Sequence, residues 1–157
     1  MEAKDYVLAA GVVVTLFLGI WNAVVNHRAS QRTTFINTVT SQRVKWIEQL
    51  RQDISSFSGL TYHWCFTDVE GETQKSEMLK EIDRLRHVIR LRLNPEGKHD
   101  KVIERLIGEI PRLTDPSNQP RLIEALEELT CTTQLLLKQE WEKVKSESKH
   151  GDLGENA

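Results

Sequence analysis

The run YVLAAGVVVTLFLGIWNAVV at residues 6–25 constrains this chain most, because none of its side chains is charged at neutral pH. A helix rises about 1.5 Å per residue, so about twenty residues cover the roughly 30 Å hydrocarbon core of a bilayer. Only Thr15 and Asn22 are strongly polar, whereas a core helix of a water-soluble domain would show a polar face. Tyr6 and Trp21 lie near the two edges, where amphipathic rings prefer the lipid headgroups. We therefore expect a retained transmembrane helix in the lipid bilayer.

The sequence flanking the run argues against a cleaved secretion signal. Such a signal begins with basic residues, but residues 1–5 contain Glu2 and Asp5 against one lysine. The segment Asn26-His27-Arg28 that follows lacks the small residues of a cleavage site. A cleaved signal and a buried core helix are the two alternatives to a membrane anchor.

The basic residues around the run predict its orientation. Arg28, Arg32, Arg43 and Lys45 follow the run, whereas Lys4 alone precedes it. Because loops rich in lysine and arginine stay on the cytoplasmic side, we expect a single-pass protein of the plasma (inner) membrane. Its C-terminal domain would lie in the cytoplasm, with a very short N-terminus outside.

Charge and cysteine content limit the classes of partner and compartment. The net charge of −2 argues against a general nucleic-acid binder, which would usually be basic. Two cysteines, Cys65 and Cys131, do not form a disulfide framework, and in the cytoplasm we expect free thiols. The reversed topology would permit one Cys65–Cys131 bridge.

Three turn signals divide the rest of the chain into segments with helical periodicity. They are TDVEGET at 67–73, NPEGKHD at 94–100 and TDPSNQP at 114–120. Each intervening segment has one apolar stripe that it cannot bury alone, and short turns make sequential helices antiparallel. We therefore predict an all-α protein, with one N-terminal transmembrane helix followed by an antiparallel bundle of about four helices. The predicted divisions are 1–28 for the short N-terminus and membrane helix, 29–42 for a juxtamembrane helix or hinge, 43–146 for the bundle and 147–157 for a disordered tail.

The predicted helices and their stripes are defined by apolar residues at steps of three, four or seven. The first helix ends near Phe66, the second covers about 74–93, the third begins at Asp100 and is kinked or ended by Pro111, and the fourth covers about 120–146. The stripes comprise Ile36, Ile47, Leu50, Ile54, Phe57, Thr61 and Trp64; Met78, Ile82, Leu85, Ile89 and Leu93; Val102, Ile103, Leu106, Ile107 and Ile110; and Leu122, Leu126, Leu129, Thr133, Leu136 and Val144.

The segment SQRVKWIEQLRQDISSF, followed later by RLRLNP, resembles a loose group of small uncharacterised bacterial and phage proteins. Members of that group have an N-terminal membrane helix, a helix with a Trp-Ile…Leu-Arg pattern and a second helix that ends in a Leu-Asn-Pro turn. The resemblance covers about residues 6–110 and implies this architecture. It implies no function.

No pattern in the sequence predicts catalysis, a cofactor or a metal site. His63 and Cys65 lie two residues apart, but no cluster of further ligands is near them in sequence. The chain lacks a Gly-x-Ser-x-Gly elbow and a glycine-rich phosphate loop. We expect a protein that is not an enzyme, without cofactor or metal.

Two surfaces are candidates for contact with partners. Gly11, Thr15, Gly19 and Asn22 share one side of the membrane helix, where small residues allow a second helix to approach closely. The second helix has a basic end, formed by Arg84, Arg86, Arg90 and Arg92, that could meet anionic headgroups or an acidic partner. The alternative is a solvated face on which these arginines pair with acidic residues of the same helix.

Together these features predict a membrane-anchored interaction, scaffold or regulatory protein that works by helix-mediated partner binding or self-association. The protein partner is unknown, a homo-oligomer is a candidate state, and nucleic acid is not an expected partner. One alternative reverses the topology: GIWNAVVNHR loosely resembles the anchor end of spanin-type phage lysis subunits, whose helical part lies outside the cytoplasm. A second alternative is a membrane-bound enzyme with an unrecognised site.

Overall fold

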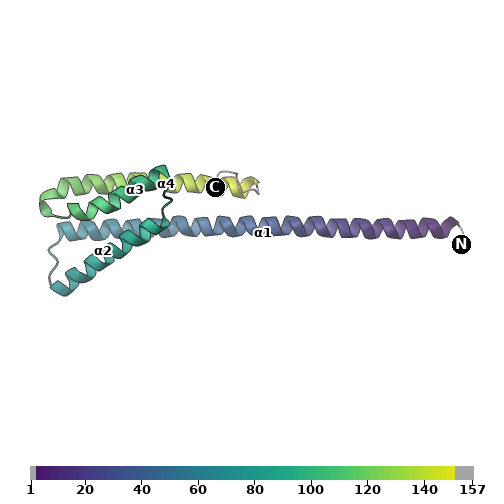
Figure 1. Ribbon diagram of the computed structural model, residues 1–157, viewed down its shortest axis with the longest axis horizontal. Helices are drawn as coiled ribbons and strands as arrows, with labels where there is room; N and C mark the ends of the chain where they lie inside the picture. The colour runs from purple at the N-terminus through teal and green to yellow at the C-terminus, as the bar shows by residue number, and fades with distance from the viewer. Residues whose placement is uncertain (1–2, 151–157) are drawn as a thin grey trace. The chain divides into compact units, whose positions relative to one another are not determined.

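The computed structural model describes the backbone of residues 3–150, and the side chains of this range except those of 3–10, 28–29, 31–33 and 150. It divides into two compact units. The bundle unit comprises residues 42–146, and the other unit comprises the residues before and after it. Every regular element in the described residues is helical, which confirms the all-α prediction (Figure 1).

The helices of the chain follow one another through short connections. In order they are α1 (Ala3–Phe66), α2 (Glu72–Arg92), α3 (Lys98–Glu109), the 3-10 helices η1 (Ile110–Leu113) and η2 (Pro116–Asn118), and α4 (Gln119–His150). The three turn signals fall at the three connections, and Pro111 lies where α3 gives way to η1, because its ring cannot continue an α-helix. The predicted helical bundle is confirmed for the described residues, and its connections lie at the predicted turns.

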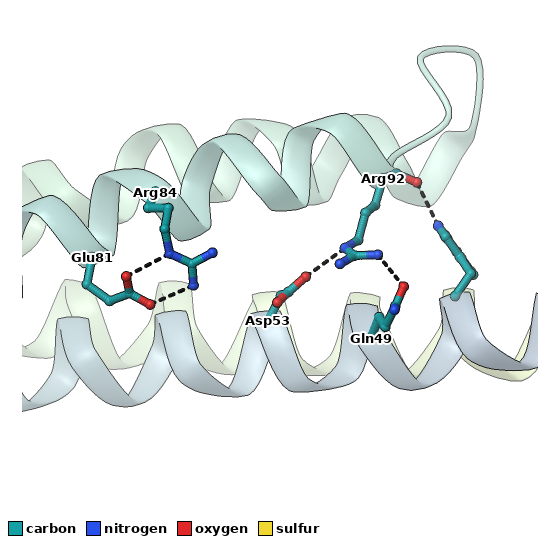
Figure 2. Close-up of polar contacts among 6 residues, drawn as sticks. Gln49, Asp53, Glu81, Arg84 and Arg92 are labelled. Carbon is teal, nitrogen blue, oxygen red and sulfur yellow. Dashed lines mark hydrogen bonds and ion pairs between the residues drawn. The ribbon is translucent and has the colours of Figure 1, made fainter.

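Cross-helix contacts show that neighbouring helices of the bundle unit run antiparallel. Arg43 Nε lies 3.5 Å from Glu140 Oε2, whereas Cys65 at the other end of α1 lines the same hollow as Thr114, shortly before α4. Arg92, the last residue of α2, pairs with Asp53 in α1 at 2.7 Å (Figure 2). The bundle is therefore built from helices that alternate in direction, as short connections require.

One hydrophobic core joins the four helices of the bundle unit. Its fully buried members come from the stripe of each helix. They include Leu50 and Phe57 of α1, Leu85 and Ile89 of α2, Ile103 and Ile107 of α3, and Leu122 and Leu129 of α4. Trp46 packs against this core from α1, and its indole N–H donates to the backbone carbonyl of Arg92 at 3.0 Å.

Local polar contacts fix the connection between α2 and α3. The backbone N–H of Asn94 donates to Asp100 Oδ1 at 2.8 Å, and the N–H of Glu96 donates to Asn94 Oδ1 at 3.0 Å. Asp100 is buried in this turn, only 5% exposed. Before α2, Gly71 has φ of 90°, a left-handed value that favours glycine.

The helical ends differ slightly from the prediction. α2 begins at Glu72 instead of Gln74, and α4 extends past Ser146 to His150. Glu147, expected in a disordered tail, is helical and buried, and its Oε2 accepts a hydrogen bond from the Thr40 hydroxyl at 3.4 Å. The rest of that tail, 151–157, lies outside the described residues.

Residues 29–42, predicted as a juxtamembrane helix or hinge, are helical throughout. Their serine and threonine content does not break the helix, and two of the hydroxyls bond to carbonyls one turn earlier. Thr34 donates to the carbonyl of Ser30 at 2.9 Å, and Thr38 donates to that of Thr34 at 2.8 Å. Such bonds satisfy the hydroxyls within the helix itself.

Candidate functional site

The apolar run is a helix whose described side chains are exposed. The structure describes these side chains from Gly11 onward, and ten large apolar ones between Val12 and Val25 are 45% to 67% exposed. Val12, Val13 and Val14 are consecutive, so they point in directions about 100° apart around the helix axis. The exposure therefore surrounds the helix. Among the residues that the structure describes, no helix has both the length and the apolar character needed to cross a membrane.

The predicted association face lies on this helix and is open. A Cβ added at Gly11 or Gly19 would meet no atom within 4 Å. The Thr15 hydroxyl donates to the carbonyl of Gly11 at 2.8 Å, and Asn26 Nδ2 donates to Asn22 Oδ1 at 3.0 Å. Thr15 and Asn22 therefore already use part of their hydrogen-bonding capacity within their own helix.

Two of the four predicted basic contact residues pair along α2 itself. Arg84 donates to both carboxylate oxygens of Glu81, at 2.7 and 2.6 Å (Figure 2), and Arg86 lies 3.2 Å from Asp83 Oδ1. The hydrogen bond from Arg84 holds the pKa of the Glu81 carboxyl below its ordinary value. Both pairs have the three-residue spacing of helix-surface ion pairs.

The other two arginines connect α2 with its neighbours. Arg90 Nε lies 3.1 Å from Glu104 of α3. Arg92 donates to Asp53 Oδ2 at 2.7 Å and to Gln49 Oε1 at 2.6 Å, both on α1 (Figure 2). All four arginines therefore have acidic partners in the chain, which favours the paired alternative over a patch for anionic ligands.

Sequence reasoning missed a hollow between α1 and α4. Its volume is about 390 Å3, and Tyr62 of α1 lines it together with a set of residues from α4: Ile123, Leu126, Glu127, Thr130 and Cys131. The ring of Tyr62 stacks on that of Phe66, with centroids 4.3 Å apart. A signal was present in the sequence: α1 has no lysine or arginine from 52 to 66, and α4 has none from 122 to 137.

The two cysteines are free thiols in different surroundings. Cys65 is buried, and its burial, together with the negative charge of Asp115, raises the pKa of the thiol. Cys131 is exposed at the hollow between α1 and α4. His63 Nδ1 lies 3.1 Å from the Thr67 hydroxyl, and the described part of the chain contains no group of three potential metal ligands.

Comparison with known proteins gives no relative for this chain: no family model, curated protein or solved structure matches it.

Proposed function

We propose that this chain is a non-enzymatic, single-pass membrane protein that presents a helical bundle for helix-mediated binding. Residues 6–25 would serve as the anchor. The bundle would act as a scaffold or regulator through its surface, without covalent chemistry. Anchoring raises the local concentration of the bundle for partners in the same membrane.

One observation carries this proposal: the apolar side chains of residues 12–25 are exposed on every side of their helix. A water-soluble monomer rarely exposes a contiguous apolar patch larger than a few hundred Å2. A single protein partner would cover one side of the helix, whereas lipid covers all sides at once. Lipid is therefore the occupant that best fits the distribution of these side chains.

Charged substitutions in the run test the anchor. Two aspartates near the bilayer centre together oppose insertion by about 5–7 kcal/mol. We therefore expect the wild-type chain to stay in carbonate-washed membranes and the double variant Val14→Asp/Phe17→Asp to leave them. Leu91→Asp is the matched control, because Leu91 is 86% exposed on α2 and outside the run. Wild-type chain in the wash, or retention of the double variant, would refute the anchor.

The same membranes test self-association through Gly11, Thr15, Gly19 and Asn22. Leucine at both glycines would separate the two helices, because close approach requires small residues. We expect Gly11→Leu/Gly19→Leu to reduce crosslinking between copies without changing membrane retention. Unchanged crosslinking would remove self-association by this face from the proposal.

The topology of the proposal places the bundle in the cytoplasm, on the strength of the basic residues that follow the run. A C-terminal reporter active only in the cytoplasm should be active, and one active only outside it should be inactive. The opposite result would favour the spanin-like alternative.

A further inference from the structure

Two acidic residues at or beside the hollow between α1 and α4, Glu127 and Glu124, have no ion pair among the described residues, as is also true of Asp68, Glu70 and Glu77 elsewhere on the bundle unit. Most surface acids have a basic partner: Glu104 pairs with Arg90, and Glu128 pairs with Arg105 at 2.7 Å. Glu127 lines the hollow, and Glu124 lies one turn before Glu128 on the exposed surface of α4. Among the described residues, neither Glu124 nor Glu127 takes part in an ion pair.

The sequence explains why Glu127 lacks a partner along α4, whereas Glu124 has Arg121 three residues before it. Positions three and four residues from Glu127 are occupied by Ile123, Glu124, Thr130 and Cys131, none of which is a cation. The facing stretch of α1, residues 52–66, contains no lysine or arginine. The hollow thus joins an apolar lining to the carboxylate of Glu127, which has no ion pair among the described residues.

We propose that this hollow is a docking groove for a basic amphipathic helix of a partner protein. The inference deepens the proposed function and depends on it, since it names the kind of partner that the anchored bundle binds. Apolar side chains of the partner would enter beside Tyr62, Ile123 and Leu126. Lysines or arginines flanking them would meet Glu124 and Glu127, in the manner of an amphipathic helix laid into a groove.

Charge decides against two other occupants. A second copy related by a two-fold axis would place the same surface against itself, so both copies would bring Glu124 and Glu127 into one interface without a basic residue from 122 to 137. Like charges that face one another across an interface are unfavourable. An anionic lipid surface would be repelled by the same carboxylates. A basic partner helix satisfies both the apolar lining and these carboxylates.

Cys131 provides a reporter inside the groove. It is exposed there, whereas Cys65 is buried, and the raised pKa of the Cys65 thiol lowers its reactive thiolate fraction. The rate at which a maleimide modifies the chain therefore reports on Cys131. The variant Cys131→Ser should abolish this fast phase.

The test measures protection of Cys131 in the full chain, reconstituted in phosphatidylcholine nanodiscs. The probe is a synthetic Leu/Lys amphipathic peptide of about eighteen residues, or five helical turns, and the matched probe has Glu in place of Lys. We expect the Leu/Lys peptide to slow modification of Cys131 in a saturable way and the Leu/Glu peptide to have no effect. Glu124→Lys/Glu127→Lys should weaken the protection about tenfold or more, by charge reversal at two contacts. Glu77→Lys, a reversal at an exposed site on α2, should leave it unchanged.

Three results would overturn the inference: no protection by the Leu/Lys peptide, equal protection by both peptides, or protection that rises with chain concentration without peptide. The last result would identify a second copy as the occupant. The rate of maleimide modification reports on the exposure of Cys131 whether the chain enters the discs or stays in buffer. Failure of the groove and failure of the anchor therefore give different results.

Discussion

Two glycines near α3 have opposite surroundings, although both lie in or beside the same helix. A Cβ added at Gly97 would lie 2.0 Å from Asp100 Oδ2, whereas one added at Gly108 would meet nothing within 4 Å. Asp100 is buried and accepts the N–H of Asn94, so it has little room to move. Position 97 therefore requires glycine, because the Asp100 side chain lies close to its backbone. Position 108 has room for a larger side chain.

This difference predicts opposite effects of alanine on stability. Gly97→Ala should lower the free energy of unfolding by about 1–3 kcal/mol, because Asp100 must leave its hydrogen bond or its buried position. Gly108→Ala should raise it by about 0.5–1 kcal/mol, because alanine loses less conformational freedom in a helix. Urea unfolding of both variants in the same detergent measures the difference. Equal effects at the two sites would contradict the role of Gly97.

The sequence predicts the turn at Gly97 but not the contact behind it. Asn, Pro and Gly within NPEGKHD are sufficient to indicate a connection between two helices. The burial of Asp100 and its distance from Gly97 depend on how the backbone enters α3, which residue preferences do not determine. A charged residue at 5% exposure is also contrary to the usual location of aspartate.

The helices themselves could be predicted because each carries a stripe with a clear helical period. Ile82, Leu85 and Ile89 of α2 are all buried, as their spacing indicates. Ion pairs within a helix were also predictable, since Arg84 and Glu81 lie three residues apart. The bond between Arg92 and Asp53 was not, because it joins residues 39 positions apart and depends on the register between α1 and α2.

A comparison of two ion pairs tests whether the link between α1 and α2 matters more than pairing along α2. The Arg92–Asp53 pair is partly buried, with side-chain exposures of 26% and 17%, whereas the Arg84–Glu81 pair is 56% and 43% exposed. We expect Asp53→Ala to destabilise the bundle by about 1–3 kcal/mol, since Arg92 then loses its charged partner in a partly desolvated place. Glu81→Ala should leave the unfolding midpoint nearly unchanged, since exposed pairs contribute little.

Chemical denaturation of the two alanine variants beside wild type measures this comparison. The double variant Asp53→Ala/Arg92→Ala isolates the interaction between the two side chains. Equal shifts of the unfolding midpoint for Asp53→Ala and Glu81→Ala would show that the Arg92–Asp53 pair stabilises the bundle no more than the Arg84–Glu81 pair does.

The groove between α1 and α4 could not be predicted from the hydrophobic periodicity of the individual helices. The apolar stripes identify which face of each helix enters the core. A groove instead forms at the surface, where the exposed sides of two neighbouring helices meet. The absence of cations from 52–66 and 122–137 becomes informative only once these stretches are known to be neighbours. Sequence reasoning therefore directed attention to the arginines of α2, which already have acidic partners in the chain.

At the scale of the whole molecule, two kinds of helix occur in one chain. The helices of the bundle unit each bury one stripe in a shared core. Residues 12–25 instead expose apolar side chains on all sides. Under the proposed function, water surrounds the bundle and lipid would surround residues 6–25.

Backbone hydrogen exchange tests this central claim most directly, on the full chain in phosphatidylcholine nanodiscs. The amides of residues 11–25 should exchange as slowly as those of the core segment 50–57, since the bilayer excludes water from a helix that the chain itself leaves uncovered. Rapid exchange across 11–25, with slow exchange retained in 50–57, would contradict the anchor.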